Sequence, residues 1–272
     1  MKISSWLTSA TRQLEAAGVG TARLDALVLL EDVTGKDRTH LLAHPELELP
    51  TEQQTHVQKL LDRRARHEPL AYIRGKTEFY GREFIITKDV LEPRPESETM
   101  IELLPDDIFS GGTIIDVGTG SGALAISAAK LRPGARVFAV DIDVNCLAVA
   151  KKNAQKHAVN IECIEGDLLE PFIENALPGP VIILANLPYV PDDHALNQAA
   201  ENEPRHAIFG GPDGLTLYGT MFEQLHDHFT QPLFVFTESL PFQHDELQNI
   251  ASTHEFKQLI DRDFIQVFKK NF

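Results

Sequence analysis

The sequence predicts an α/β fold in which a doubly wound parallel sheet follows a small helical bundle. From Gly111 onward the chain repeats a pattern of apolar strand, turn and amphipathic helix, which is typical of parallel sheets with helices on both faces. The run 181–185 (Val-Ile-Ile-Leu-Ala) has no polar alternation, as expected of a strand buried on both faces. The first part of the chain instead carries apolar residues at three- to four-residue spacing, which favours helices.

Residues 1–75 are expected to form the helical domain. The predicted helices span residues 3–17, 21–35 and 51–65, with a turn over 37–45. Thr21 stands where a cap of the second helix is expected, and the Thr-Glu-Gln-Gln of residues 51–54 has the spacing of a capping box. The densest positive cluster of the chain follows, and we interpret it as a solvated helix face: Arg63, Arg64, Arg66 and His67.

Residues 76–95 are expected to form a hairpin linker. The runs 78–80 and 83–86 flank a Gly-Arg pair, which is typical of a short hairpin. Residues 91–98 (Leu-Glu-Pro-Arg-Pro-Glu-Ser-Glu) then combine prolines with three carboxylates before a predicted helix over 99–104. This composition fits either a plain linker or a functional segment.

Residues 96–272 are expected to form the doubly wound domain. The predicted strands are 113–117, 137–140, 161–165, 181–185 and 233–237, and the predicted helices 123–130, 144–156, 215–226 and 245–253. The tail contains two further apolar runs, 256–260 and 264–268, which predict a hairpin at the sheet edge.

The charge is distributed unevenly along the chain. The formal net charge is −15; residues 1–90 hold 13 Lys and Arg against 13 Asp and Glu, whereas residues 91–272 hold 12 against 27. An acidic domain argues against binding nucleic acid mainly through its phosphates, because that binding requires a basic patch. A protein or small-molecule partner is favoured.

The sequence also indicates the cellular compartment of the protein. No apolar run is long enough to span a membrane, and the first residues lack the layout of a signal peptide, so we expect a cytoplasmic protein and no membrane partner. Cys146 and Cys163 form no C-x-x-C pair and are expected to be reduced core thiols. The eleven histidines include no H-E-x-x-H pattern, so no metal site is expected.

A glycine-rich turn, Asp-Val-Gly-Thr-Gly-Ser-Gly at residues 116–122, lies between a predicted strand and a predicted helix. Its glycines allow a tight turn and close approach of a ligand to the backbone. Asp141 ends the next strand, where an acid accepts hydrogen bonds from ribose hydroxyls. These features predict an adenosine-containing cofactor. Because Gly118, Gly120 and Ala123 satisfy G-x-G-x-x-A, a nicotinamide dinucleotide fits them as well as S-adenosylmethionine does.

Two further acids favour S-adenosylmethionine. Asp116, directly before the glycines, would repel a pyrophosphate but can help hold a cationic amino group, and Asp167 follows the third strand where it can meet an adenine amino group. A dehydrogenase would need a proton donor or acceptor near its carbonyl substrate, yet no His or Lys lies at a predicted strand end.

The fourth strand ends in Asn-Leu-Pro-Tyr at residues 186–189, where we expect the chemistry. Parallel sheets bind ligands at the carboxyl ends of their strands, and Pro188 favours extended backbone with carbonyls free to face a cleft. The Asn186 amide, the carbonyls of Leu187 and Pro188 and the Tyr189 ring would form an acceptor-rich site with a flat wall. Such a site suits a substrate NH2 group.

Several motifs of this chain resemble those of the HemK-type protein-(glutamine-N5) methyltransferases, which modify peptide chain release factors. The glycine turn is shared by many methyltransferases, whereas the motifs of the helical part and the loop 208–215 are more specific. The resemblance rests on residues 22–25, 35–38 and 68–75 in the helical part, 78–81 in the hairpin, and 93–98, 116–122 and 208–215 beyond it.

The resemblance implies methyl transfer from S-adenosylmethionine to a glutamine in the Gly-Gly-Gln motif of class 1 release factors, with the helical domain as the docking domain. We expect a monomer that binds no nucleic acid directly. The predicted catalytic residues are Asn186, Leu187, Pro188 and Tyr189. The predicted cofactor-binding residues are Asp116, Gly118, Thr119, Gly120, Ser121, Gly122, Asp141, Asp167, Leu168 and Asn186.

Two stretches depart from the family pattern. The family usually has Asn-Pro-Pro-Tyr, and Leu187 instead resembles the Asn-Leu-Pro-Tyr of ribosomal RNA adenine dimethyltransferases. The family's glycine-containing stretch after the fifth strand is not recognisable in Thr-Glu-Ser-Leu-Pro at 237–241, and we expect that stretch to affect packing rather than chemistry. The alternatives are methylation of an amino group in RNA or DNA, a dinucleotide-dependent oxidoreductase, and a non-catalytic adaptor.

Overall fold

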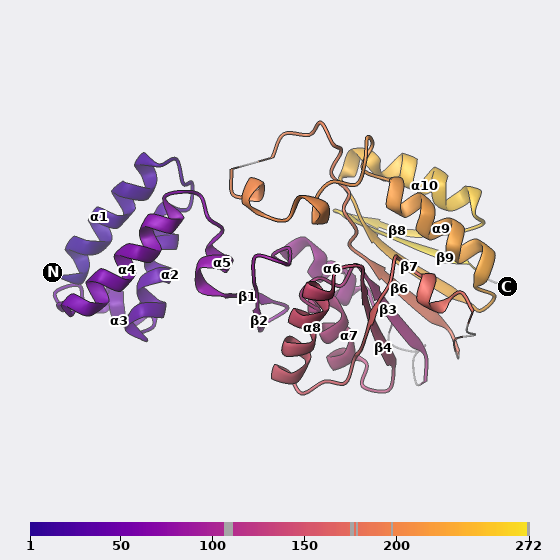
Figure 1. Cartoon of the computed structure of the whole chain (residues 1–272), viewed down its shortest axis with the longest axis horizontal. Coiled ribbons are helices and arrows are strands. Elements are labelled where there is room, and N and C mark those ends of the chain that lie inside the picture. Colours follow the sequence, from indigo (N-terminus) through magenta and orange to yellow (C-terminus); the bar gives the residue numbers. More distant parts are fainter. Residues whose placement is uncertain (106–110, 175–176, 178, 197, 271–272) are drawn as a thin grey trace. The chain divides into compact units, whose positions relative to one another are not determined.

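The computed structural model describes residues 1–105, 111–174, 177, 179–196 and 198–270, and the chain divides into two units (Figure 1). The first unit comprises residues 1–75 together with 196–202, and the second comprises 76–195 together with 203–272. Among the described residues, no helix has both the length and the apolar character that crossing a membrane requires.

The first unit is helical. A buried apolar cluster that includes Trp6, Leu14, Leu29 and Leu61 holds its helices together. The predicted helices over 3–17, 21–35 and 51–65 are confirmed, and two short helices that were not predicted join them. The helices of residues 1–75 are α1 (Ile3–Ala16), α2 (Ala22–Thr34), α3 (Arg38–Ala43), α4 (Thr51–Arg64) and α5 (Leu70–Arg74).

The two predicted helix caps have different outcomes, because Thr21 does occupy the N-cap position of α2, whereas the predicted capping box of α4 is wrong. Thr21 makes no side-chain capping bond, and α4 begins at Thr51 itself, with Pro50 in the cap position. The threonine of the expected capping box therefore lies inside the first turn. The predicted turn over 37–45 contains α3, which Asp37 caps by accepting the His40 amide at 2.7 Å.

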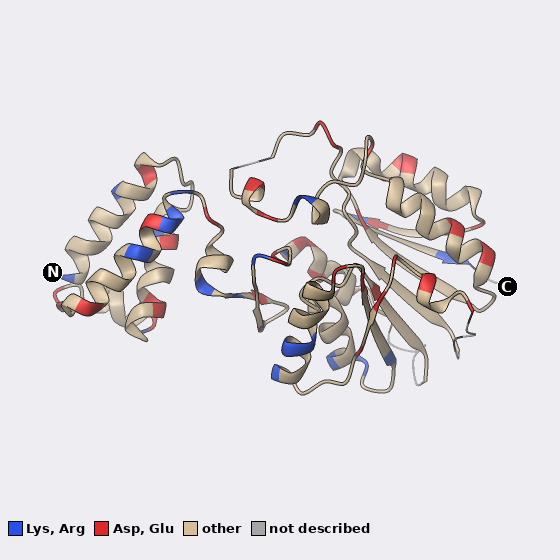
Figure 2. Cartoon of the chain, viewed as in Figure 1, with Lys and Arg blue, Asp and Glu red and all other residues tan. Residues whose placement is uncertain are grey.

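The arginines at the end of α4 are largely paired within the first unit. Arg64 donates to Asp25 at 2.7 Å, and these side chains are only 11% and 5% exposed. Arg63 donates from Nε to Glu68 at 2.8 Å. Arg66 is exposed, so the prediction of a solvated face holds for Arg66 and is wrong for Arg64. Figure 2 shows acidic residues among the basic ones on these helices.

The second unit contains a seven-stranded sheet in the order β5-β4-β3-β6-β7-β9-β8. The pairs from β5 through β7 are parallel, whereas β9 runs antiparallel to both β7 and β8. All five predicted strands and the predicted edge hairpin are confirmed. The strands are β3 (Thr113–Val117), β4 (Arg136–Asp141), β5 (Glu162–Glu165), β6 (Val181–Ala185), β7 (Leu233–Glu238), β8 (Lys257–Arg262) and β9 (Ile265–Lys270).

Helices cover this sheet (Figure 1). Alternate strand residues such as Ile115 and Ile183 pack in one apolar cluster with Tyr218 and Phe222 of α9 and Leu247 of α10. Both cysteines are free; Cys146 is buried, as expected of a core thiol, whereas Cys163 is only partly buried. The helices of this unit are α6 (Glu98–Glu102), α7 (Ala123–Leu131), α8 (Val144–Lys156), α9 (Thr216–His228) and α10 (His244–Thr253).

The predicted hairpin consists of β1 (Lys76–Phe79) and β2 (Arg82–Ile85), and it is anchored to α8. The fully buried Asn153 accepts the Ile85 amide at 2.7 Å and donates to the Ile85 carbonyl at 3.0 Å. Asn153 also donates to the Ser121 carbonyl at 2.8 Å. One amide side chain therefore joins the hairpin to the glycine turn.

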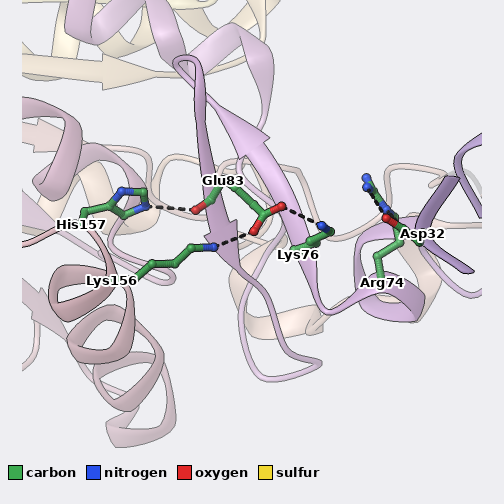
Figure 3. A network of polar contacts seen from close by, with 6 residues as sticks. All are labelled: Asp32, Arg74, Lys76, Glu83, Lys156 and His157. Atoms are coloured by element: carbon green, nitrogen blue, oxygen red, sulfur yellow. Dashed lines mark hydrogen bonds and ion pairs between the residues drawn. The ribbon is translucent and has the colours of Figure 1, made fainter. Parts of the chain in front are cut away.

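Charged contacts add to this anchor (Figure 3). Glu83 in β2 accepts from Lys76 at 2.7 Å and from Lys156 of α8 at 2.8 Å, and the Glu83 carbonyl contacts the His157 ring at 3.0 Å. The Lys156 and Lys76 ammonium groups lower the pKa of Glu83 to about 2, so this carboxylate is charged at any physiological pH.

We predict that Asn153→Ala lowers the free energy of unfolding by about 2–4 kcal/mol, because each buried backbone group left without a partner costs about 1–3 kcal/mol. Urea denaturation measures this change. Gln155→Ala, at an exposed position of the same helix, is the control and should change stability by no more than about 0.5 kcal/mol. Equal stabilities of the two variants would contradict the anchoring role of Asn153.

Candidate active site

The register of the parallel strands brings the predicted site residues together. In-register pairing joins Val117 to both Val140 and Ala185, and Ala185 to Thr237. The residue that follows each of these positions therefore lies at the same edge of the sheet. These residues are Gly118, Asp141, Asn186 and Glu238.

The glycine turn after β3 needs its glycines for two reasons. Gly118, Gly120 and Gly122 have φ angles of +71°, +54° and +80°, which other residues rarely adopt. A Cβ on Gly118 would lie 3.2 Å from Leu187 Cδ2, and one on Gly122 would lie 3.1 Å from Ala150 Cβ. Gly118 thus lets Leu187 approach the turn, whereas Gly122 serves the packing of α7 against α8.

Asp116 is buried beneath this turn. Its Oδ2 accepts from the Thr119 hydroxyl at 2.6 Å and from the Ala125 amide at 3.0 Å. Burial raises the pKa of Asp116 to about 7, although both hydrogen bonds favour the ionised form. A cation bound nearby would stabilise the ionised carboxylate further.

Asp141 is held by main-chain amides at the end of β4. Its Oδ2 accepts from Gly120 at 2.9 Å and its Oδ1 from Asp143 at 2.9 Å. Burial raises the pKa of this carboxyl above its ordinary value. A carboxylate offers about four acceptor positions, so Asp141 retains capacity for hydroxyl donors.

Two cavities adjoin these strand ends. The main cavity has a volume of about 260 Å³ and the side cavity about 60 Å³, and they share Leu91, Gly118, Gly120 and Asn186. Of the predicted residues, the main cavity is also lined by Asp141, Asp167, Leu168, Leu187 and Pro188. The side cavity is also lined by Asp116, Thr119 and Ser121, and by Ser97, which was not predicted.

The loop 208–215 fixes the backbone of the Asn-Leu-Pro-Tyr segment. A Cβ on Gly210 would lie 2.1 Å from the Pro188 oxygen, and one on Gly214 would lie 2.0 Å from the Tyr189 oxygen. Gln243 donates to that Tyr189 oxygen at 2.8 Å. The carbonyls of Pro188 and Tyr189 are thus packed against protein, which leaves the Leu187 carbonyl as the candidate main-chain acceptor for a substrate.

Tyr218 accommodates the departure at Leu187. A proline at this position would have no amide proton, whereas Leu187 has one and donates it to the Tyr218 hydroxyl at 3.3 Å. The same hydroxyl lies 3.2 Å from the Ala185 oxygen and 2.5 Å from the Glu238 main-chain oxygen. The additional N–H group is therefore satisfied inside the fold.

A chain of side-chain hydrogen bonds lies behind the Asn-Leu-Pro-Tyr segment. Asn186 Nδ2 donates to Ser97 Oγ at 2.9 Å, and Ser97 donates to Glu238 Oε2 at 2.6 Å. The Tyr189 hydroxyl donates to Glu238 Oε1 at 3.0 Å. The stretch 237–241, which was expected to affect packing rather than chemistry, therefore lies next to the site, because Glu238 contacts Ser97 and Tyr189.

The charged stretch before α6 is also tied into the fold. Arg94 pairs with Glu203, which is buried, and Glu98 accepts the Tyr80 amide at 2.7 Å. Thr77 donates to Glu92 at 2.9 Å. These contacts hold the segment that carries Ser97.

Some predicted residues lie where the cavities do not reach. Gly122 and the ring of Tyr189 line neither cavity. Conversely, sequence reasoning missed Ser97, Tyr218, Glu238 and Gln243. The signal for Glu238 was its position directly after the predicted strand 233–237, the same kind of signal that identified Asn186.

Comparison with known proteins agrees with this architecture. Residues 5–75 match the PrmC N-terminal domain, and residues 94–203 match the methyltransferase small domain. A release factor glutamine methyltransferase from Koribacter versatilis is 37% identical over 84% of this chain and 82% of its own length. The one from Bacillus subtilis is 36% identical over 86% of this chain and 81% of its own length.

The crystal structure of a methyltransferase from Pyrococcus furiosus has the same fold, with a TM-score of 0.52 and 14% identity over 82% of this chain and all of that one. Fold and domain matches together place the protein among the Rossmann-like methyltransferases. Within that class, the extent and identity of the matches show that the chain belongs to the release factor glutamine methyltransferase family.

We predict that Gly210→Ala destabilises the protein by about 1–3 kcal/mol, because its methyl group must displace the Pro188 carbonyl. Gly219→Ala is the matched control: it lies in α9 with no atom within 4 Å of the added methyl, so it should leave stability unchanged or raise it by up to about 1 kcal/mol. Thermal unfolding of both variants measures the difference, and a stable Gly210→Ala protein would show that this loop is not tightly packed.

Proposed function

We propose that this protein transfers a methyl group from S-adenosylmethionine to the side-chain amide nitrogen of the glutamine in the Gly-Gly-Gln motif of class 1 release factors. Membership of the family supports the reaction and its substrate. The observation that carries the proposal is the end of β6, where Asn186 and Leu187 line the main cavity beside the glycine turn. This arrangement presents acceptors to an NH2 group.

The side chains that line the two cavities fit S-adenosylmethionine. Asp141 retains acceptor capacity for ribose hydroxyls, and Asp167 and Leu168 line the same cavity for the adenine. Asp116 lines the side cavity, where a carboxylate favours a cationic amino group and disfavours a pyrophosphate. When bound, S-adenosylmethionine supplies an electrophilic methyl group.

The chain itself must orient a poor nucleophile. The lone pair of an amide nitrogen is delocalised into its carbonyl, as the rotational barrier of about 18–20 kcal/mol for peptide amides reflects. The Asn186 Oδ1 and the Leu187 carbonyl would each accept one N–H bond of the substrate amide, which fixes the direction of the nitrogen. The same oxygens stabilise the positive charge that develops on that nitrogen.

Proton transfer requires no base before the reaction. The substrate nitrogen becomes acidic only as it gains positive charge, so its proton can leave afterwards. Tyr189 lines neither cavity, so it would support the segment from behind rather than form the flat wall expected for the amide plane. Its hydroxyl is engaged by Glu238, and burial raises the pKa of this phenol far above its ordinary value, so Tyr189 is a packing group rather than a base.

The two parts of the chain have separate roles in this proposal. Residues 1–75 would form the docking domain, 76–95 the hairpin linker and 96–272 the methyltransferase domain. Because Arg63 and Arg64 are paired internally, Arg66 is the member of the cluster that is available to an acidic surface of the release factor. Two or more cationic partners on the first unit would be needed for strong docking, since a single exposed ion pair contributes about 1 kcal/mol or less.

Variants at two strand ends should separate chemistry from cofactor binding. We predict that Asn186→Ala lowers the methyl-transfer rate by roughly 10²–10³ while nearly retaining affinity for S-adenosylhomocysteine, since it removes one oriented acceptor. Asp141→Ala should instead weaken that affinity. Calorimetry with S-adenosylhomocysteine and with NAD measures the cofactor affinity, and initial rates measure methyl transfer. Wild-type turnover of Asn186→Ala would contradict the acceptor site.

The substrate assay follows the label from S-adenosylmethionine. We predict that wild-type protein labels an intact class 1 release factor, and that the Gln→Ala change in the Gly-Gly-Gln motif abolishes labelling. Ribosomal RNA and duplex DNA are parallel substrates, because an adenine or guanine amino group can meet the same acceptors. Label on the Gln→Ala factor, or on nucleic acid alone, would overturn the proposed substrate.

A further inference from the structure

We propose that Glu238 is a positioning residue that determines which end of the Asn186 amide faces the substrate, and that it acts through the Ser97 hydroxyl. The proposal rests on the proposed function for its consequence, since acceptors suit an NH2 group only if Asn186 directs its oxygen to the cavity. It adds a second layer behind the Asn-Leu-Pro-Tyr segment, built from residues of two other segments of the chain.

The direction of the hydrogen bonds follows from counting protons. An ionised carboxylate can only accept, so both Ser97 and Tyr189 must donate to Glu238, at 2.6 and 3.0 Å. Ser97 has one hydroxyl proton, and Glu238 receives it. The remaining contact of Ser97 Oγ, with the Asn186 amide at 2.9 Å, must therefore be one in which Asn186 donates.

This constraint fixes the amide. An asparagine presents NH2 on one side and oxygen on the other, and the hydrogen-bond partners decide which is which. Because Ser97 requires the NH2 group, Asn186 Oδ1 is the group left for the cavities that Asn186 lines. The ionised Glu238 thus makes Asn186 an acceptor toward the substrate.

Protonation of Glu238 removes the constraint. A protonated Glu238 can donate to Ser97, and Ser97 can then donate to the oxygen of Asn186, so the amide can turn its NH2 group toward the substrate. Such an orientation repels the N–H bonds of the substrate instead of accepting them. Methyl transfer should therefore depend on the ionised form of Glu238.

The surroundings place this change near neutral pH. Glu238 is fully buried, and burial raises its pKa to about 7 against the opposing effects of its two donors, Ser97 and Tyr189. From the segment before α6, Glu96 raises the pKa and Arg94 lowers it. From α9, the Tyr218 hydroxyl bonds the Glu238 main-chain oxygen.

The sheet and burial hold Glu238 in place. It is the last residue of β7 and pairs with Ile265 of β9, so its backbone cannot move away from the site without opening the sheet. Ser97 is equally buried, at 2% exposure. Both members are therefore rigid supports for Asn186, whose side chain is partly accessible from the cavity.

The kinetic test uses full-length protein, saturating S-adenosylmethionine and release factor. Wild-type kcat should fall as the pH decreases below about 7. Ser97→Ala should lower kcat about 10- to 100-fold at pH 8, keep the affinity for S-adenosylhomocysteine within about twofold, and lose the dependence on pH below 7. Ser97→Thr, which restores the hydroxyl, should recover both kcat and the pH dependence.

Ser239→Ala is the matched control. Ser239 is buried next to Glu238, and its hydroxyl has no hydrogen-bond partner among the described residues. The same substitution there removes the same atoms without interrupting the path to Asn186, so kcat and its pH profile should stay as in wild type. A Ser97→Ala protein that behaves like Ser239→Ala would overturn the proposal.

An NMR titration tests the positioning without any substrate. The side-chain amide signals of Asn186, assigned by their loss in Asn186→Ala, should shift with the same midpoint as the Glu238 carboxyl carbon, assigned by its loss in Glu238→Gln. In Ser97→Ala the Asn186 signals should no longer follow Glu238. Signals of Asn186 that ignore Glu238 in wild-type protein would refute the proposal. Failure to label the release factor would instead refute the proposed function.

Discussion

The site depends on one constraint, the in-register parallel pairing of β4, β3, β6 and β7. Because Val117 pairs with Val140 and Ala185, and Ala185 with Thr237, four strands end on one line. Side chains alternate between faces along a strand, so a slip of one residue would turn the terminal side chains to the opposite face. Such a slip would also disrupt the core, since residues such as Ile115 and Ile183 would lose their packing against α9 and α10.

The second requirement is that the polar backbone of the Asn-Leu-Pro-Tyr segment be satisfied. Gln243 bonds the Tyr189 carbonyl, Gly210 packs on the Pro188 carbonyl, and Tyr218 accepts the Leu187 amide. Each contact engages one polar backbone group, which is then not available to a ligand. Leucine at position 187 in place of proline therefore leaves the hydrogen-bond acceptors that face the cavity unchanged, because its additional amide proton is hydrogen-bonded to the buried Tyr218 hydroxyl.

The sequence was sufficient for features that follow from local pattern. Uninterrupted apolar runs identified the strands, and the residues that directly follow them, such as Asp141 and Asn186, do line a cavity at the sheet edge. Contacts between distant segments were beyond such patterns. Ser97 and Glu238 are 141 positions apart, and no spacing rule links a serine before α6 to the end of β7. The capping box failed for a local reason, because α4 begins at Thr51 with Pro50 in the cap position.

The site also keeps two carboxyl groups where burial opposes their charge. Asp116 and Glu238 are both almost inaccessible, and burial raises the pKa of each to about 7. A buried charge is tolerated only where hydrogen bonds replace water, and each of these groups has two donors. Their positions suit different tasks: Asp116 lines the side cavity and can meet a cation directly, whereas Glu238 lies behind Ser97 and Tyr189 and acts on ligands only through them. Methyl transfer from a cationic cofactor to a substrate nitrogen is compatible with both carboxylates. The positive charge moves from the cofactor to the nitrogen, so no anion is brought against them.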